Sequence, residues 1–283
     1  MFYDTSSFIK PAPHLRDDRL HALVMLLPRE SKRLLARAVL QMPEVKRVLD
    51  EGWFVVSRGV TPAYILEELT GQPADKGNST AGIVAEGRLA SVIMEDRLGP
   101  WVFENGKLSE TPAPQALGKF RARDVSIKGA NAVDPNGNIG VLAADGGGGT
   151  VGGIWGTLTA RGSHCVAPVS LERLIPDVIE AARVCGNHLW DLTMGQAAGL
   201  MPVVNAQVVT EIEAIAILSG VKATHVASGG VAGSEGEVML SISGEEADVR
   251  AAFEMLEGIK GEEQFESPRL IPYIREPEAA PKH

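Results

Sequence analysis

The sequence predicts an α/β protein with an open parallel sheet, followed by a smaller α+β unit near the C-terminal end. Short apolar runs of β-forming residues alternate with segments whose apolar positions recur at helical spacing. Glycine-rich turns follow the ends of several of these runs. The chain has 283 residues, which is enough for one large or two ordinary domains, each with its own apolar core.

Composition narrows the classes of function. The 27 Lys and Arg against 36 Asp and Glu give a net charge of −9, which argues against a general nucleic-acid or anionic-membrane role. No apolar run approaches the roughly 18 residues of a membrane span, and the first residues lack the order of a signal peptide. We therefore expect a cytoplasmic protein. Cys165 and Cys185 stand apart from each other and from any His pair, so we expect neither a disulfide nor a metal site.

Residues 1–28 are expected to form an N-terminal extension, and the Rossmann-like α/β domain is assigned to residues 29–200. Apolar residues recur at helical spacing over 28–52, and Pro43 divides this segment into two helices. The run of β formers at 53–57 is uninterrupted, which is typical of a strand that is covered on both faces.

A glycine turn, RGVTP, follows this strand at 58–62 and leads into a helix over 63–69. Thr61 is expected to cap the helix, with Pro62 at its first position. Residues 80–110 change character and predict a small antiparallel excursion. Its two turn dipeptides, Glu86-Gly87 and Asn105-Gly106, are typical of hairpins.

Further strands and helices alternate after this excursion, and such alternation predicts a parallel sheet. After Gly186 the predicted order is strand, helix, strand, strand, helix, which is most of a ferredoxin-like unit. We assign this unit to residues 201–275 and a solvated tail to 276–283. The expected strands are 124–127, 139–142, 165–169, 203–209, 221–228 and 237–243, and the expected helices are 150–160, 171–184, 210–218 and 245–257.

Three glycine turns follow the carboxyl ends of predicted parallel strands, where such sheets bind ligands. They are RGVTP at 58–62, KGANAVDPNG at 128–137 and DGGGGT at 145–150. Glycine lets backbone N–H groups approach a ligand, and helix N-termini favour anions, so phosphate or carboxylate is the expected guest. The alternative is that these turns serve only close packing. The candidate ligand-binding residues are Arg58, Gly59, Thr61, Lys128, Gly129, Asn131, Asp134, Asp145, Gly146, Gly147, Gly148, Gly149 and Thr150.

The stretch KGANAVDPNGNIGVLAADGGGG at 128–149 resembles the ribose-5-phosphate isomerase segment in which Asp-Gly-Ala-Asp leads to Asp-Pro-Asn and a Lys-Gly-Gly-Gly loop. RGVTPAYILEEL at 58–69 is similar to the turn that begins the same fold and helps to hold the sugar phosphate. By the order of its motifs, the chain resembles the NagB/RpiA/CoA-transferase-like superfamily over residues 30–185. The resemblance implies a Rossmann-like parallel sheet and, from the isomerases, a ferredoxin-like second domain.

The departures from the isomerase motif bear on activity. Lys128 and Asn131 stand where the motif has two acidic residues, Asp145 replaces the loop lysine, and only Asp134 is retained. Aldose–ketose isomerisation needs a carboxylate base, so we predict no ribose-5-phosphate isomerase activity. The resemblance instead favours a protein that binds a small anionic metabolite, whether phosphorylated, a carboxylate or CoA-linked.

Two alternatives stay open. The first is an enzyme: Phe103-Glu104-Asn105-Gly106 resembles the Ser-Glu-Asn-Gly motif whose glutamate is the nucleophile of CoA transferases, although the same residues also predict a hairpin turn. Lys128 could serve an isomerase-like enzyme as a nucleophile if it is desolvated. The second alternative is a structural oligomer. We expect a homo-oligomer, no required cofactor and no metal, and CoA is the one cofactor that the resemblance implies.

Overall fold

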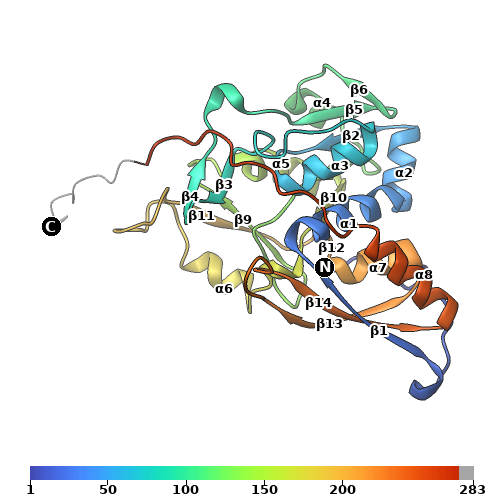
Figure 1. Cartoon of the computed structure of the whole chain (residues 1–283). Coiled ribbons are helices and arrows are strands. Elements are labelled where there is room, and N and C mark those ends of the chain that lie inside the picture. The colour runs from blue at the N-terminus through green and yellow to red at the C-terminus, as the bar shows by residue number, and fades with distance from the viewer. Residues whose placement is uncertain (274–283) are drawn as a thin grey trace.

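The chain folds around a mixed sheet of six strands (Figure 1). The computed structural model describes residues 1–273, so the predicted tail at 276–283 lies outside the described residues. The strands, in their order across the sheet, are β12 (Gln207–Val209), β10 (His164–Pro168), β7 (Val125–Ile127), β2 (Trp53–Val56), β5 (Trp101–Glu104) and β6 (Lys107–Ser109).

The centre of this sheet is parallel, as predicted. β2 pairs with β7 in parallel, with Phe54 beside Val125, and β7 pairs in the same sense with β10. β12 continues the parallel order beyond β10. The three central strands are almost wholly buried, which agrees with their uninterrupted apolar sequences.

Helices cover both faces of the main sheet. Pro43 occupies the first turn of the second helix and ends the helical run before it, so the predicted division into two helices is confirmed. One face packs against α1 (Pro28–Gln41), α2 (Pro43–Asp50) and α3 (Val60–Thr70), and the other against α4 (Ala113–Lys119) and α5 (Gly149–Arg161).

The start of α3 differs from the prediction. Gly59, not Thr61, is the N-cap residue, and the carbonyl of Gly59 accepts the first helical bond from the N–H of Ala63 at 3.0 Å. Gly59 has φ +153°, a conformation that other residues rarely adopt, so the chain turns into the helix two residues earlier than the Thr-Pro signal suggested. Thr61 and Pro62 lie within the first turn.

Both hairpins predicted over 80–110 form. Glu86-Gly87 and Asn105-Gly106 have positive φ at both residues, as two-residue hairpin turns require. The first hairpin, β3 (Gly82–Ala85) and β4 (Arg88–Ser91), is a separate two-stranded sheet. The second hairpin is not an excursion, because β5 pairs along the free edge of β2 and buries Val102 and Phe103 there.

The predicted strand at 139–142 does form, but outside the parallel sheet. β9 (Ile139–Ala143) pairs antiparallel with β8 (Ala132–Val133) and with β11 (Gly199–Val203). The segment between β7 and β9 is too short to hold the helix that a parallel crossover needs, so β9 folds back on β8 instead. Helix α6 (Val178–Arg183) packs against this small sheet.

The ferredoxin-like unit is formed only in part. β13 (Lys222–Ser228) and β14 (Val238–Gly244) pair antiparallel, and α7 (Glu211–Ser219) and α8 (Glu246–Glu257) pack nearby, as expected. The expected first strand, β12, instead joins the main sheet, and β14 pairs with β1 (Leu20–Leu26) from the expected N-terminal extension.

The hydrophobic core includes residues from both sides of the predicted domain boundaries. The division into domains stays a prediction. One cluster of buried residues includes Val24 of β1, Leu35 of α1, Ile127 of β7 and Leu240 of β14. Within residues 1–273, no helix is long and apolar enough to cross a lipid bilayer.

Candidate functional site

The carboxyl ends of β2 and β7 border a cavity of about 660 Å³. Arg58 and Gly59 follow β2, and Lys128 and Gly129 follow the neighbouring β7, so both pairs lie at one edge of the sheet. Gly149 and Thr150 at the start of α5 line the same cavity. The structure therefore brings the three glycine turns together.

Gly129 shows how closely two of the turns approach each other. A side-chain carbon at Gly129 would lie 3.3 Å from Cδ of Pro62, which is tighter than most real contacts. Asn131 holds the next strand, because its side-chain oxygen accepts the N–H of Leu142 at 3.0 Å. The second turn is therefore bonded to β9, and a larger residue than glycine at position 129 would crowd Pro62 of the first turn.

A more apolar part of the lining comes from the β3–β4 hairpin and the segment after α8. Figure 1 shows this segment in red, crossing the molecule from α8 to β4. The N–H of Ile271 donates to the carbonyl of Ser91 at 2.8 Å, and the N–H of Ile93 donates to Arg269 at 3.1 Å. Phe265 and Ile271 of this segment line the cavity beside residues of the hairpin.

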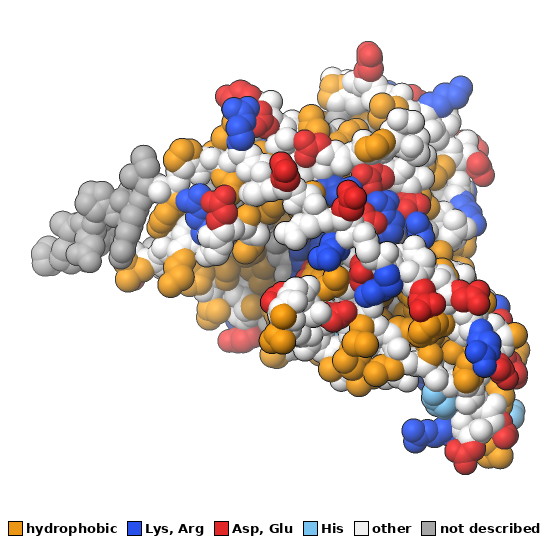
Figure 2. All heavy atoms as spheres, in the orientation of Figure 1, with side chains coloured by type: hydrophobic (Ala, Val, Ile, Leu, Met, Phe, Trp, Pro, Cys, Tyr) orange, Lys and Arg blue, Asp and Glu red, His pale blue; other side chains and the backbone are white. Residues whose placement is uncertain are grey.

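Basic side chains predominate among the charged residues of the cavity. Five of the lining residues are Lys or Arg and one is acidic, Asp145, in a protein whose net charge is −9. In Figure 2, the visible face is hollowed near its centre and Lys and Arg side chains lie beside the hollow. The basic lining residues are Lys32, Arg58, Arg97, Lys128 and Arg173.

Two of these cations share one carboxylate. Nζ of Lys32 lies 3.0 Å from Glu172 and also donates to the carbonyl of Pro28. Nε of Arg173 lies 3.5 Å from the same Glu172 oxygen, and its Nη1 donates to the carbonyl of Ala130. Glu172 therefore compensates part of the charge at this end of the cavity.

The other three cations have no such compensation. Nε of Arg58 donates to the carbonyl of Leu98 at 3.0 Å, and Nε of Arg97 donates to Val92 at 2.8 Å. Carbonyls are neutral acceptors, so both guanidinium charges remain. Within residues 1–273, none of Arg58, Arg97 and Lys128 forms an ion pair with a carboxylate.

Burial shifts the pKa of Lys128 downward. Desolvation lowers the pKa of its amine to about 8; the nearby Cys165 opposes this shift, and Arg173 adds to it. Burial also raises the pKa of the Cys165 thiol to about 12, and the nearby Lys128 opposes that shift. Burial also lowers the pKa of Arg58, with Arg97 as a second cause. An anion in the cavity would relieve these costs.

Asp145 organises the third turn. Its Oδ1 accepts the N–H groups of Gly147 at 2.9 Å and Gly149 at 3.3 Å, so its carboxylate holds the turn that leads into α5. Gly148 has φ +81° and is the N-cap residue of α5. Gly146 and Gly147 are exposed and do not line the cavity, which removes them from the predicted site.

Asp134 also lies outside the cavity, contrary to the prediction. It is fully buried, and its two oxygens accept four hydrogen bonds, from the N–H groups of Asn136, Asn138 and Val178 and from the side-chain amide of Asn138. Burial would raise the pKa of Asp134, but these bonds outweigh it and hold the pKa below its ordinary value. Asp134 therefore stabilises the turn between β8 and β9 and is not available to a ligand.

Glu104 lies beside the amino end of β2, whereas the cavity lies at the carboxyl end of that strand. It pairs with Trp53, the first residue of β2, whereas Arg58 follows the last. Its side chain is exposed beside the Asn105-Gly106 turn. The hairpin explanation of this motif is confirmed, and the motif places no nucleophile near the cavity.

Sequence reasoning missed Lys32, Arg97 and Arg173. Arg173 follows the carboxyl end of β10, so the rule that identified Arg58 and Lys128 could have included it. Lys32 comes from α1, and Arg97 follows the hairpin, so only the tertiary structure brings these two side chains to the cavity.

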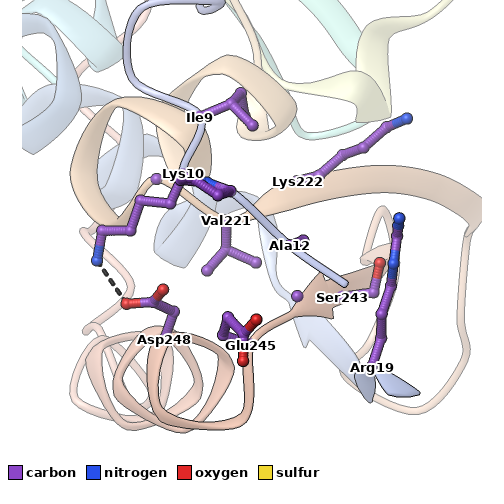
Figure 3. A pocket seen from close by; sticks show the side chains of 12 residues that line it. Ile9, Lys10, Ala12, Arg19, Val221, Lys222, Ser243, Glu245 and Asp248 are labelled. Atoms are coloured by element: carbon purple, nitrogen blue, oxygen red, sulfur yellow. Dashed lines mark hydrogen bonds and ion pairs between the residues drawn. The ribbon is translucent and has the colours of Figure 1, made fainter. Parts of the chain in front are cut away.

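A second cavity of about 240 Å³ lies between the N-terminal segment and the sheet of β1, β13 and β14. Figure 3 shows Lys10 pointing toward Asp248, and these side chains form an ion pair at 2.6 Å. Arg19, Lys222 and Glu245 complete a lining of mixed charge. This cavity is smaller and has no excess of one charge comparable to that of the first.

Comparison with known proteins adds no assignment: no family model, curated protein or solved structure matches this chain. In the part of the chain that the structure describes, no three His, Cys, Asp or Glu side chains are grouped so that they could hold a metal ion.

Proposed function

We propose that this protein binds a small anionic metabolite in the cavity at the carboxyl edge of β2 and β7. The observation that carries the proposal is the set of three cations, Arg58, Arg97 and Lys128, that line the cavity without an ion-pair partner in residues 1–273. All three are partly buried; removing part of a charge from water is costly without a partner, and a ligand of opposite charge offsets that cost. The volume of about 660 Å³ lies in the usual range for small-molecule sites.

The first turn of α5 supports the same class of ligand. Gly149 and Thr150 line the cavity, and the N–H of Thr150 has no acceptor within residues 1–273. An N–H group without a partner at a helix N-terminus is suited to an anionic oxygen. Phosphorylated compounds, carboxylates and CoA-linked compounds all carry such oxygens, and we retain all three as ligand classes.

The resemblance to the NagB/RpiA/CoA-transferase-like superfamily is also a proposal. The parallel order of β2, β7 and β10 and the convergence of the glycine turns support it. An enzyme that uses Glu104 is not supported, because Glu104 lies beside the amino end of β2 and the cavity lies at the carboxyl end. The structural-oligomer alternative predicts no ligand at all, so one binding experiment separates it from our proposal.

Thermal unfolding in the presence of sugar phosphates, small carboxylates and CoA esters tests the proposal. A compound present at 100 times its dissociation constant should stabilise the protein by about 2.7 kcal/mol. Lys128→Ala should weaken binding by about 1.5–3 kcal/mol, the range for a hydrogen bond to a charged group. Lys107→Ala, which changes an exposed lysine on β6, is the matched control and should bind as wild type does.

Two results would contradict the proposal. One is that no compound of the three classes raises the unfolding temperature. The other is that a stabilising compound acts equally on wild type, Lys128→Ala and an Arg58→Ala variant, which would place its binding site elsewhere.

A further inference from the structure

We infer that Lys128 is a covalent binding site, and that its amine forms an imine with the carbonyl group of an anionic aldehyde or ketone in the cavity. The ligand class is then a 2-oxo acid or a phosphorylated carbonyl compound. This inference rests on the proposed function, because the anionic group of the ligand would bring the carbonyl to the amine. The experiment is chosen so that imine formation at Lys128 and anion binding in the cavity can fail separately.

The position of Lys128 is the first support. It follows the central strand β7, and its backbone N–H donates to the carbonyl of Val166 in β10 at 3.0 Å. The strand end is thus fixed by the main sheet, while the side chain lines the cavity. A nucleophile on a rigid element can be held in one orientation toward a bound ligand.

The second support is the contrast between the two lysines of the cavity. Burial lowers the pKa of Lys32 as well, but Lys32 donates both to Glu172 and to the carbonyl of Pro28, and these bonds hold its amine in place. Lys128 makes no side-chain hydrogen bond or ion pair in the part of the chain that the structure describes. Its neutral amine is therefore free to attack the carbonyl carbon of a ligand, whereas the amine of Lys32 is held by two bonds.

The groups around Lys128 favour its neutral form. Arg173 from the segment after β10 is cationic, and Arg58 and Lys32 add positive charge to the same cavity. Cys165 of β10 acts in the opposite direction, but burial of the lysine is the larger effect. Asp145 is the acidic lining residue, and its Oδ1 is already bonded to the α5 turn. With a pKa of about 8, roughly a tenth of the amine is neutral at pH 7.

The chemistry needs no partner beyond the ligand. The lone pair of the neutral amine forms a bond to the carbonyl carbon, and the carbonyl oxygen takes a proton from the amine to give a carbinolamine. Loss of that oxygen as water, with the second amine proton, leaves a carbon–nitrogen double bond. Arg58 and Arg97, which have no ion-pair partner in residues 1–273, remain available to the phosphate or carboxylate of the ligand.

The test uses dihydroxyacetone phosphate as the probe and sodium cyanoborohydride as the trapping reagent. The hydride reduces the imine carbon, and a solvent proton completes a stable secondary amine on the lysine. After proteolysis, mass spectrometry measures the modified fraction at Lys128 and, in the same digest, at Lys32 and the exposed Lys107. Pyruvate serves as a second probe for 2-oxo acids.

We expect Lys128 to be modified at least about tenfold faster than Lys107 at pH 7.5, because a larger fraction of its amine is neutral. It should also react faster than Lys32, whose amine is bonded to Glu172 and to the carbonyl of Pro28. Glycerol 3-phosphate, which has the phosphate but no carbonyl, should give no adduct and should slow the reaction at Lys128 alone. Lactate should do the same for pyruvate. The Lys128→Arg variant keeps the charge and should lose the fast-reacting site, whereas Lys107→Arg should retain it.

The outcomes separate the two proposals. If glycerol 3-phosphate raises the unfolding temperature of wild type but Lys128 reacts no faster than Lys107, the imine site is wrong and anion binding stands. If Lys128 reacts rapidly and glycerol 3-phosphate does not compete, the anion does not direct the reaction, and the inference as stated is wrong. If there is neither stabilisation nor fast labelling with either pair of compounds, both proposals fail for these ligand classes.

Discussion

Replacing Lys128 by Met should make the unliganded protein more stable while it removes anion binding. Met keeps a long unbranched side chain and removes the charge. The pKa of Lys128 falls from 10.5 to about 8 on folding. Each pH unit of such a change corresponds to about 1.4 kcal/mol, so holding the charge in the cavity costs at most about 3 kcal/mol at pH 7.

Lys128 remains partly exposed to solvent, and the solvent screens its charge and reduces this cost. We therefore expect Lys128→Met to raise the free energy of unfolding by about 1–2 kcal/mol at pH 7. The direction is unusual, because most substitutions at a partly buried position destabilise a protein.

The gain should depend on pH in a defined direction. Between pH 8 and pH 10.5 the unfolded state binds a proton at Lys128 that the folded state has released, so the stability of wild type rises with pH in this window. Lys128→Met lacks this contribution. The advantage of the variant should therefore be full below pH 8 and should disappear as the pH approaches 10.5.

Urea unfolding of both proteins at pH 7 and at pH 10 measures the effect, and the difference between them cancels the titration of all other groups. Lys107→Met, on the exposed face of β6, should change stability little at either pH. The reasoning is refuted if Lys128→Met is less stable than wild type by the same amount at both pH values. Lys128 would then support the fold of the cavity wall through packing.

Four further results are expected from variants at other positions. Gly148→Ala should lower the free energy of unfolding by about 1–3 kcal/mol in urea, because Gly148 has φ +81° and its new Cβ would press on Cε of Met201. Gly146→Ala should be close to neutral in the same assay, since no atom lies within 4 Å of its Cβ position. Asp134→Ala should cost about 2–4 kcal/mol by urea unfolding, and a near-neutral result would mean that its four hydrogen bonds contribute little. Glu104→Gln should leave thermal stabilisation by every ligand unchanged, and a loss of stabilisation would restore the CoA-transferase alternative.

The parts of the fold that the sequence could predict are those with local signals. The buried run at 53–57, the division at Pro43 and the Asn105-Gly106 turn each depend on residues that are close together in the chain. The same holds for the glycine turns at Arg58 and Lys128, whose place at a sheet edge follows from the strands before them.

The parts of the fold that the sequence could not predict depend on which distant segment a strand or a side chain pairs with. Nothing in the residues of β12 distinguishes a strand of the main sheet from a strand of a ferredoxin-like unit, because both are short and apolar. Likewise, the pattern of Asp134 before Pro is compatible with a ligand or a turn. Only its burial against Val178, more than 40 positions along the chain, settles its role.

The pairing of β1 with β14 bears on how the chain is synthesised and folds. Leu26 lies opposite Val238, so these strands are about 200 residues apart in the sequence. The edge of β1 therefore has no partner until most of the protein has left the ribosome, while α1 and β2, which follow β1 directly, can already assemble. Contacts of such separation slow folding. During synthesis, Leu23 and Met25 of β1, which remain exposed even in the folded protein, would form an apolar strand open to chaperones and to other nascent chains.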